Sequence, residues 1–157
     1  MPTYSLDTSS LVAAWVEHYP IDNFEGFWDR IDALMTTDAA VLSTEVVRET
    51  KKRDEGLHKW LKTRAKGIVE IDDACQEQVM YIMGKYPKFV DTRTGKNLGD
   101  PFVIGLSLTY DPHLIVVSEE NGGAAHRPAI PFVCGAEGVK CIKLVDLIRR
   151  EKWRFRG

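Results

Sequence analysis

Near its start the chain reads Thr3-Tyr4-Ser5-Leu6-Asp7-Thr8-Ser9-Ser10, a short strand-forming run followed by one acid and a series of hydroxyl side chains. A first strand that ends at Asp7 would place this carboxylate at the C-terminal edge of a sheet, where open α/β proteins bind their ligands. Asp7 is therefore the first candidate for chemistry. A simpler role is also open, because Asp, Ser and Thr all cap helices well and a helix is expected to begin near Ser10.

The composition predicts a single domain over residues 1–157. Hydrophobic residues make up 44% of the chain and charged residues 28%, which provides enough apolar material for one buried core. No apolar run reaches the roughly 20 residues that span a bilayer, and the chain does not open with a signal-peptide pattern. We therefore expect a cytoplasmic protein that has no membrane partner.

Cysteine and histidine do not point to a metal site. The three cysteines form an odd set without a CxxC pair, so they predict neither a disulfide framework nor a zinc site, and we expect them to be core or near-core thiols. The histidines show no metal-ligand spacing and are expected to be structural or exposed. These residues are Cys75, Cys134, Cys141, His18, His58, His113 and His126.

Charge is distributed unevenly along the chain, although the formal net charge is only −2. Residues 48–66 contain eight Lys or Arg against three acids, and residues 140–157 contain seven against two. The remainder of the chain is correspondingly acidic. Basic segments that flank an acidic centre suit an enzyme acting on a polyanion through metal ions, although solvated helix faces would give the same pattern.

Apolar periodicity predicts strands that alternate with helices, which indicates an α/β fold with a central parallel β-sheet flanked by helices on both faces. The clearest buried parallel strand is Leu114-Ile115-Val116-Val117. Asn23 is expected to cap the second helix, and the polar segment 91–99 is expected to be a loop. The expected strands lie at 3–6, 39–42, 114–117 and 139–144, and the expected helices at about 10–17, 24–35, 44–50, 54–66, 72–86, 100–108 and 145–153. Residues 129–134 are expected to form a short turn or helix.

Four acids occupy related positions in this arrangement. Asp7 follows the first strand, Glu49 lies in the helix after the second strand, Asp100 is at a helix start, and Glu120 follows the strongest strand. Because the ends of parallel strands lie on one edge, where the following helices begin, these carboxylates can converge. Converging carboxylates repel each other, and a hard divalent cation such as Mg²⁺ or Mn²⁺ would compensate them.

Each acid also has a simpler interpretation. Glu49 could be a solvated helix residue, with Glu45 the better candidate if the helix is rotated. Asp100 could be only an N-cap. Glu119 and Glu120 could form a polar strand exit, and either of them could be the fourth acid.

The order and spacing of these features resemble the PIN-domain nucleases, and in particular a PIN-like branch akin to VapC-type toxins. The resemblance covers nearly the whole chain, although no single motif is specific. The matching segments are Leu6-Asp7-Thr8-Ser9-Ser10-Leu11, Tyr19-Pro20 with Phe24 and Phe27-Trp28, Val46-Val47-Arg48-Glu49, Gly99-Asp100-Pro101-Phe102-Val103-Ile104-Gly105-Leu106, Val116-Val117-Ser118-Glu119-Glu120, Ile130-Pro131-Phe132-Val133-Cys134 and Gly138-Val139-Lys140-Cys141.

This resemblance implies catalytic roles for Asp7, Glu49, Asp100 and Glu120, with Asp7, Asp100 and Glu120 as the Mg²⁺ or Mn²⁺ ligands. Ser118 takes the place of the usual Thr at the fourth position, and Glu120 stands where many PIN domains have Asp. Thr8 and Ser9 could support the site through their hydroxyls or could only cap the first helix.

The expected function is that of a metal-dependent endoribonuclease, the toxin of a toxin–antitoxin pair. RNA would be the substrate, and the resemblance implies a cognate antitoxin and a homodimer. One alternative is a catalytically inactive or housekeeping PIN-like module that binds nucleic acid or a partner. Another is a phosphotransfer or hydrolase domain with Asp7 as nucleophile; it fits less well because the acidic companions that such sites use near the first strand are missing.

Overall fold

A computed structural model describes residues 2–90 and 98–155 of the chain. Its centre is a five-stranded sheet in which every pairing is parallel and the strand order is β3-β2-β1-β4-β5. The strands are β1 (Tyr4–Leu6), β2 (Ala40–Ser43), β3 (Ile68–Val69), β4 (Ile115–Val117) and β5 (Cys141–Ile142). Most of the expected loop at 91–99 lies outside the described residues.

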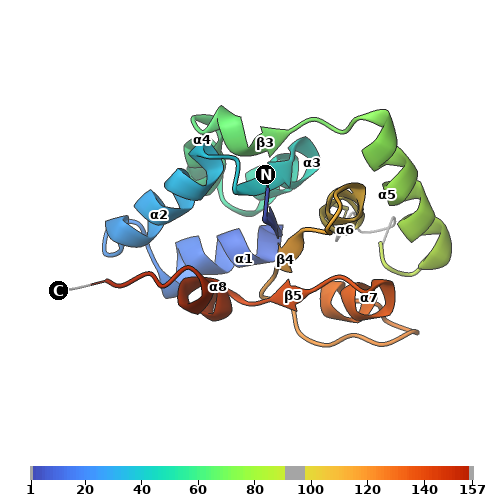
Figure 1. Ribbon diagram of the computed structural model, residues 1–157. Coiled ribbons are helices and arrows are strands. Elements are labelled where there is room, and N and C mark those ends of the chain that lie inside the picture. The colour runs from blue at the N-terminus through green and yellow to red at the C-terminus, as the bar shows by residue number, and fades with distance from the viewer. Residues whose placement is uncertain (1, 91–97, 156–157) are drawn as a thin grey trace.

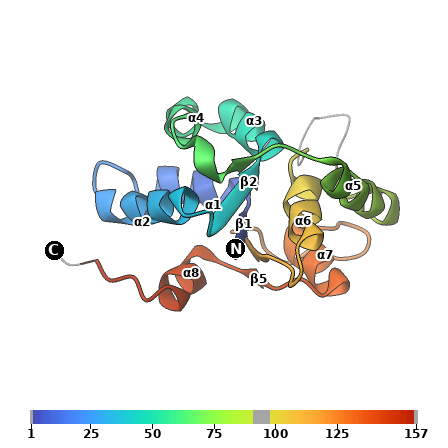
Figure 2. The same cartoon turned by 45° about the horizontal axis from the view of Figure 1, so that its top comes forward.

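Helices cover both faces of the sheet, as expected. Helices α1 and α2 lie on one side, while α5 and α6 lie on the other (Figures 1 and 2). The helices are α1 (Thr8–Ala13), continued by a π-helical turn (Ala14–His18), α2 (Glu25–Thr36), α3 (Thr44–Arg53), α4 (Glu55–Lys62), followed by a 3₁₀ turn (Ala65–Gly67), α5 (Asp73–Lys85), α6 (Asp100–Thr109), α7 (Ile130–Glu137) and α8 (Leu144–Arg150).

Three helix starts follow from side-chain capping. Ser43, Asp54 and Asp72 accept hydrogen bonds from the backbone N–H three residues ahead, at 3.2, 3.0 and 2.8 Å, which satisfies one otherwise unpaired donor at each helix start. The expected cap at Asn23 is wrong: the N-cap of α2 is Phe24, which makes no side-chain capping bond. A turn that returns the Phe24 N–H to the Pro20 carbonyl carries the chain past Asn23 before the helix begins.

The sheet has one strand that periodicity did not predict. β3 is only two residues long, and both of them are half-buried, so it carries neither an apolar run nor an alternating pattern. It pairs with the end of β2, where Leu42 and Ser43 lie opposite Ile68 and Val69. The last strand is likewise shorter than the expected 139–144.

Helix α6 packs closely against both the sheet and α5. Val103, Ile104 and Leu106 are almost fully buried. Between them Gly105 allows close approach of α5, because a Cβ there would lie 2.6 Å from Val79 Cγ2 and 3.1 Å from the Val79 backbone nitrogen. A side chain at position 105 would push the two helices apart, so this glycine fixes how deeply α6 sits.

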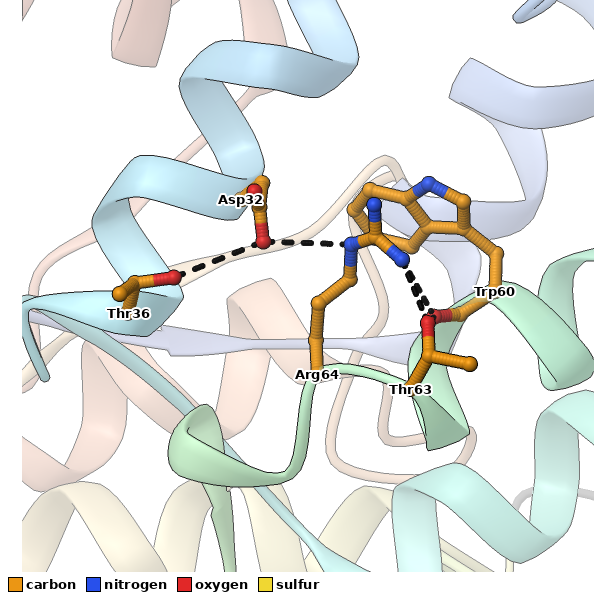
Figure 3. A network of polar contacts seen from close by, with 5 residues as sticks. All are labelled: Asp32, Thr36, Trp60, Thr63 and Arg64. Carbon is orange, nitrogen blue, oxygen red and sulfur yellow. Dashed lines mark hydrogen bonds and ion pairs between the residues drawn. The ribbon is translucent and has the colours of Figure 1, made fainter.

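A polar network ties α2 to the end of α4 (Figure 3). The Arg64 guanidinium lies 4.0 Å from the ring centroid of Trp60, and its Nε is 3.2 Å from Asp32 Oδ1. Arg64 also donates to the carbonyl of Trp60 at 3.3 Å and to the Thr63 hydroxyl, while Thr36 donates to Asp32. These contacts hold the end of α4 against α2.

The three cysteines are free thiols, with Cys75 and Cys134 buried and Cys141 half-buried, so the core or near-core placement is confirmed. No helix among the described residues combines the length and the apolar character that crossing a membrane requires.

Candidate active site

The strand order creates a crevice at the C-terminal ends of β1 and β4. From β1 the chain winds outward through β2 to β3, and it later crosses to β4 and β5 on the other side of β1. Neighbouring strands whose connections leave in opposite directions form a topological switch point, where α/β sheets bind ligands. Asp7 follows β1 and Ser118 follows β4, so both reach this crevice.

Asp7 is buried, with 1% of its surface exposed, and hydroxyl groups hold its carboxylate. Oδ2 accepts hydrogen bonds from the hydroxyls of Ser9 and Ser118, the latter at 2.8 Å. Asp7 occupies the N-cap position of α1, but its side chain makes no capping bond. The hydroxyls of Ser9 and Ser118 thus hold the Asp7 carboxylate at the C-terminal ends of β1 and β4, and the capping interpretation does not account for it.

Ser9 and Ser118 fasten the two strand ends together. Ser118 Oγ also accepts the Glu120 N–H at 3.1 Å, and Ser9 Oγ accepts the Glu119 N–H at 3.1 Å. Ser9 therefore supports the acidic site as well as lying in the first turn of α1. The Thr8 hydroxyl is buried and has no hydrogen-bond partner among the described residues.

The two adjacent glutamates have different surroundings. Glu119 Oε1 accepts the Leu144 N–H at 2.7 Å, so this side chain holds the start of α8. Glu120 Oε2 accepts the Ile130 N–H at 3.2 Å at the start of α7. Of these two glutamates, Glu120 is the one whose charge raises the pKa values of Asp7 and Asp100. The geometry therefore favours Glu120 as the fourth acid.

Glu49 and Asp100 reach the site from α3 and α6. Glu49 Oε2 accepts the Gly99 N–H at 2.7 Å, directly before Asp100. Glu45 instead forms a 2.7 Å ion pair with Arg48, which takes it away from the cluster. Asp100 is the first residue of α6, one position inside the N-cap Gly99, and only 3% of its surface is exposed.

Burial and repulsion between like charges raise the pKa values of the acids in this cluster. Burial, followed by repulsion from Glu120, raises the pKa of Asp7 to about 7. Burial, then repulsion from Asp7, Glu120 and Glu49, raises the pKa of Asp100 far above its usual range. Burial also raises the pKa of Glu120. All three shifts show that the fold disfavours full ionisation of these acids in the absence of a compensating cation.

The donor set fits a hard divalent cation. Asp100 Oδ2 is buried and has no hydrogen-bond partner in the described part of the chain, although buried carboxylate oxygens normally have one. Oxygen donors from Asp7, Asp100 and Glu120 are the type that Mg²⁺ and Mn²⁺ prefer. Within residues 2–90 and 98–155, no group of three or more His, Cys, Asp or Glu side chains is already arranged to hold a metal ion.

Sequence reasoning did not anticipate the backbone donors of this site. The N–H groups of Gly99 and Ile130 each bind one acid of the cluster, and a backbone donor has no signature in residue identity. The only available signal was a glycine immediately before Asp100.

Comparison with solved structures gives the class of fold. One similar chain comes from the crystal structure of VapBC2 from Rickettsia felis bound to a DNA fragment from their promoter; the match covers 90% of this chain and 98% of that chain, with a TM-score of 0.54 and 13% sequence identity. At this identity the likeness concerns the fold alone, and it confirms the expected PIN-like α/β architecture.

The chain belongs to the family described as "Domain of unknown function (DUF4411)", whose pattern matches residues 4–155. A search of curated proteins finds no match.

Proposed function

We propose that the chain is a metal-dependent endoribonuclease that acts in the cytoplasm. The observation that carries this proposal is the convergence of Asp7, Glu49, Asp100 and Glu120 at the switch point of the sheet, where Asp7 and Asp100 are buried, Glu49 and Glu120 are half-buried, and the four acids repel each other. Such a cluster lowers the stability of a protein unless a ligand compensates it. A divalent cation together with a phosphodiester is a ligand pair that this arrangement can serve.

Asp7, Asp100 and Glu120 would hold Mg²⁺ or Mn²⁺, and Glu49 would assist. When bound, the ion would activate a water molecule and stabilise the charge that develops on the scissile phosphate. The chain's own residues prepare this site: Ser9 and Ser118 orient Asp7. The uneven charge of the sequence, with basic segments beside the acidic centre, supports a polyanionic substrate.

Cleavage of RNA tests the proposal. Wild type and the Asp7→Asn and Asp100→Asn variants are incubated with single-stranded and structured RNA in EDTA, Mg²⁺ or Mn²⁺, after circular dichroism shows that all three are folded. We expect cleavage only by wild type and only with metal. If folded wild type leaves every RNA intact under all conditions, the enzymatic proposal fails.

The likeness to a chain of the VapBC2 assembly favours a second element of function, that of a toxin restrained by a cognate antitoxin and assembled as a homodimer. A small gene for a DNA-binding protein beside this one, whose product co-purifies with the chain and suppresses cleavage, would support it. A chain that sediments as a monomer and has no such neighbour would favour a housekeeping nuclease or an inactive binding module.

The geometry gives little support to the phosphotransfer alternative. Asp7 Oδ2 already accepts two hydroxyl hydrogen bonds, and the side chain is almost fully buried, which leaves poor access for in-line attack on a phosphoryl group. Trapping with beryllium fluoride at Asp7 would reverse this assessment.

A further inference from the structure

A groove leads away from the acidic cluster along one face of α1 and the π-helical turn. It begins at Ser9, whose hydroxyl binds Asp7, and ends at His18, a helical rise of about 13 Å at 1.5 Å per residue. Its volume is about 380 Å³, the size of a small-molecule site rather than of a surface for a duplex. The lining residues are Ser9, Val12, Ala13, Glu17, His18, Arg53, Glu119, Asn121 and Lys143.

Arg53 forms one wall of this groove. It is the last residue of α3 and lies four positions after Glu49, so both side chains share one face of the helix. Its positive charge is close enough to Glu120 to lower the pKa of that carboxyl, which opposes the effects of burial and of Glu49. Arg53 is exposed and makes no ion pair among the described residues, so its guanidinium is available to an anion that enters beside the cluster.

Lys143 also lines the groove. It precedes α8, and its ammonium donates a 2.6 Å hydrogen bond to Oδ1 of Asn121, the residue that follows Glu120 in the chain. That bond keeps the cation at the groove. The nearby Glu119 carboxylate is engaged by the Leu144 N–H. The groove lining therefore includes two cations from different elements, and one of its acids, Glu119, already has a partner.

We propose that this groove binds the sugar–phosphate backbone of single-stranded RNA next to the cleavage position, held between Arg53 and Lys143. The inference rests on the proposed nuclease function and adds to it the path of the strand. Guanidinium and ammonium groups are the usual partners of phosphate oxygens. Ser9 lines the groove and its hydroxyl binds Asp7, so a strand that occupies the groove lies next to the candidate active site.

Glu17 provides a second test of the proposal, in which the expected effect on RNA binding is opposite to that of Arg53. It lines the groove, is exposed, and forms no ion pair with the described residues. A phosphate backbone in this groove is repelled by Glu17, so neutralising this residue strengthens RNA binding. A purely structural role for the groove residues would not produce opposite effects from Arg53 and Glu17.

Binding of a fluorescein-labelled 12-nucleotide single-stranded RNA, measured by anisotropy in EDTA to prevent cleavage, tests the inference. We expect Arg53→Ala and Lys143→Ala each to weaken binding about 5- to 10-fold at 100 mM salt and to reduce the salt slope by about one. Glu17→Gln should tighten binding. Lys140→Ala is the matched control, because exposed Lys140 precedes β5, at the end of that strand opposite to Lys143, and does not line the groove.

The outcomes separate this inference from the proposed function. If wild type binds and cleaves RNA but Arg53→Ala and Lys143→Ala bind it as Lys140→Ala does, the groove is not the strand path, although the nuclease proposal stands. The groove assignment is also overturned if a labelled Asp/Glu-rich 12-residue peptide requires Arg53 and Lys143 while RNA does not. Failure of the nuclease proposal appears instead as wild type without cleavage in the metal-containing assay.

Discussion

The backbone N–H of Gly99 donates a 2.7 Å hydrogen bond to Oε2 of Glu49, a residue fifty positions earlier in the chain. The bond joins α3, which carries Glu49, to the start of α6, which carries Asp100. One contact therefore sets the separation of two acids of the cluster. It also leaves little space, because a Cβ on Gly99 would lie 3.0 Å from the same oxygen.

Gly99→Ala should displace the Glu49 carboxylate. The backbone at position 99 has φ −80° and ψ −20°, which alanine adopts without strain, so the effect should reach the site and not the fold. We expect RNA cleavage to fall about 10- to 100-fold while the melting temperature stays within a few degrees. Cleavage kinetics and thermal melts decide this, and a fully active Gly99→Ala would show that Glu49 can move freely.

Gly84→Ala is the control for that substitution. Gly84 lies in α5, and no atom lies within 4 Å of its hypothetical Cβ. Replacing a helical glycine by alanine should stabilise the protein by about 0.5–1 kcal/mol. Cleavage should be unchanged.

Glu119→Gln and Glu120→Gln should separate stability from activity. Glu119 holds the start of α8, so its neutralisation should lower stability by about 0.5–1 kcal/mol and leave cleavage nearly intact. Glu120→Gln should abolish most cleavage, because the Glu119 side chain is held by the Leu144 N–H and cannot replace it. Chemical denaturation and cleavage assays on the pair test this. Loss of activity in Glu119→Gln with full activity in Glu120→Gln would reverse the assignment.

The metal-free protein should lose stability as pH rises. Asp7 keeps its proton in the folded state up to a pKa of about 7, whereas the unfolded chain releases it near 3.8. The contribution of Asp7 to the free energy of unfolding is therefore full below about pH 4 and declines toward pH 7. Asp100 and Glu120 shift in the same direction. Glu137, whose pKa is lowered by its hydrogen bonds despite opposing burial, acts in the opposite direction only at more acidic pH.

Thermal melts in EDTA between pH 5 and 8 measure this dependence. The melting temperature should fall across the range, and Mn²⁺ should reverse the fall because a bound cation favours ionised carboxylates. A melting temperature that rises steadily from pH 5 to 8 without metal would contradict the clustered-acid interpretation.

Asp7→Asn should melt higher than wild type in EDTA at pH 8. Removing one charge from a repelling cluster relieves a cost of about 1–3 kcal/mol, since one pKa unit corresponds to about 1.4 kcal/mol. The upward shift caused by Mn²⁺ should shrink in the same variant. Asp29→Asn, on the exposed face of α2, should match wild type in both measurements. A destabilised Asp7→Asn with an intact Mn²⁺ shift would make Asp7 a structural acid.

The positions of three acids could be anticipated because strands and helix starts leave clear patterns. Asp7 and Glu120 each follow a buried strand, and Asp100 precedes a proline and an apolar helix. The choice between Glu45 and Glu49 was harder to make from the sequence, since both lie on the same face of one helix. The pairing of Glu45 with Arg48 distinguishes them, and it depends on rotamers that the sequence does not specify.

The choice between Glu119 and Glu120 could not be made from periodicity. Strand β4 ends at Val117, so the alternation of side chains no longer applies two residues later. The choice depends on which backbone N–H groups arrive from α7 and α8, ten and twenty-five residues downstream. For the same reason the short strand β3 escaped prediction, because its pairing with β2 and not its composition defines it.

The central position of β1 also bears on synthesis of the chain at the ribosome. The middle strand β1 (Tyr4–Leu6) is synthesised more than a hundred residues before its partner β4 (Ile115–Val117). Asp7 is thus synthesised long before Ser118 and Glu120 are added. A product interrupted before that point lacks β4, the second strand of the candidate site. We therefore expect incomplete chains to have no nuclease activity and to be degraded.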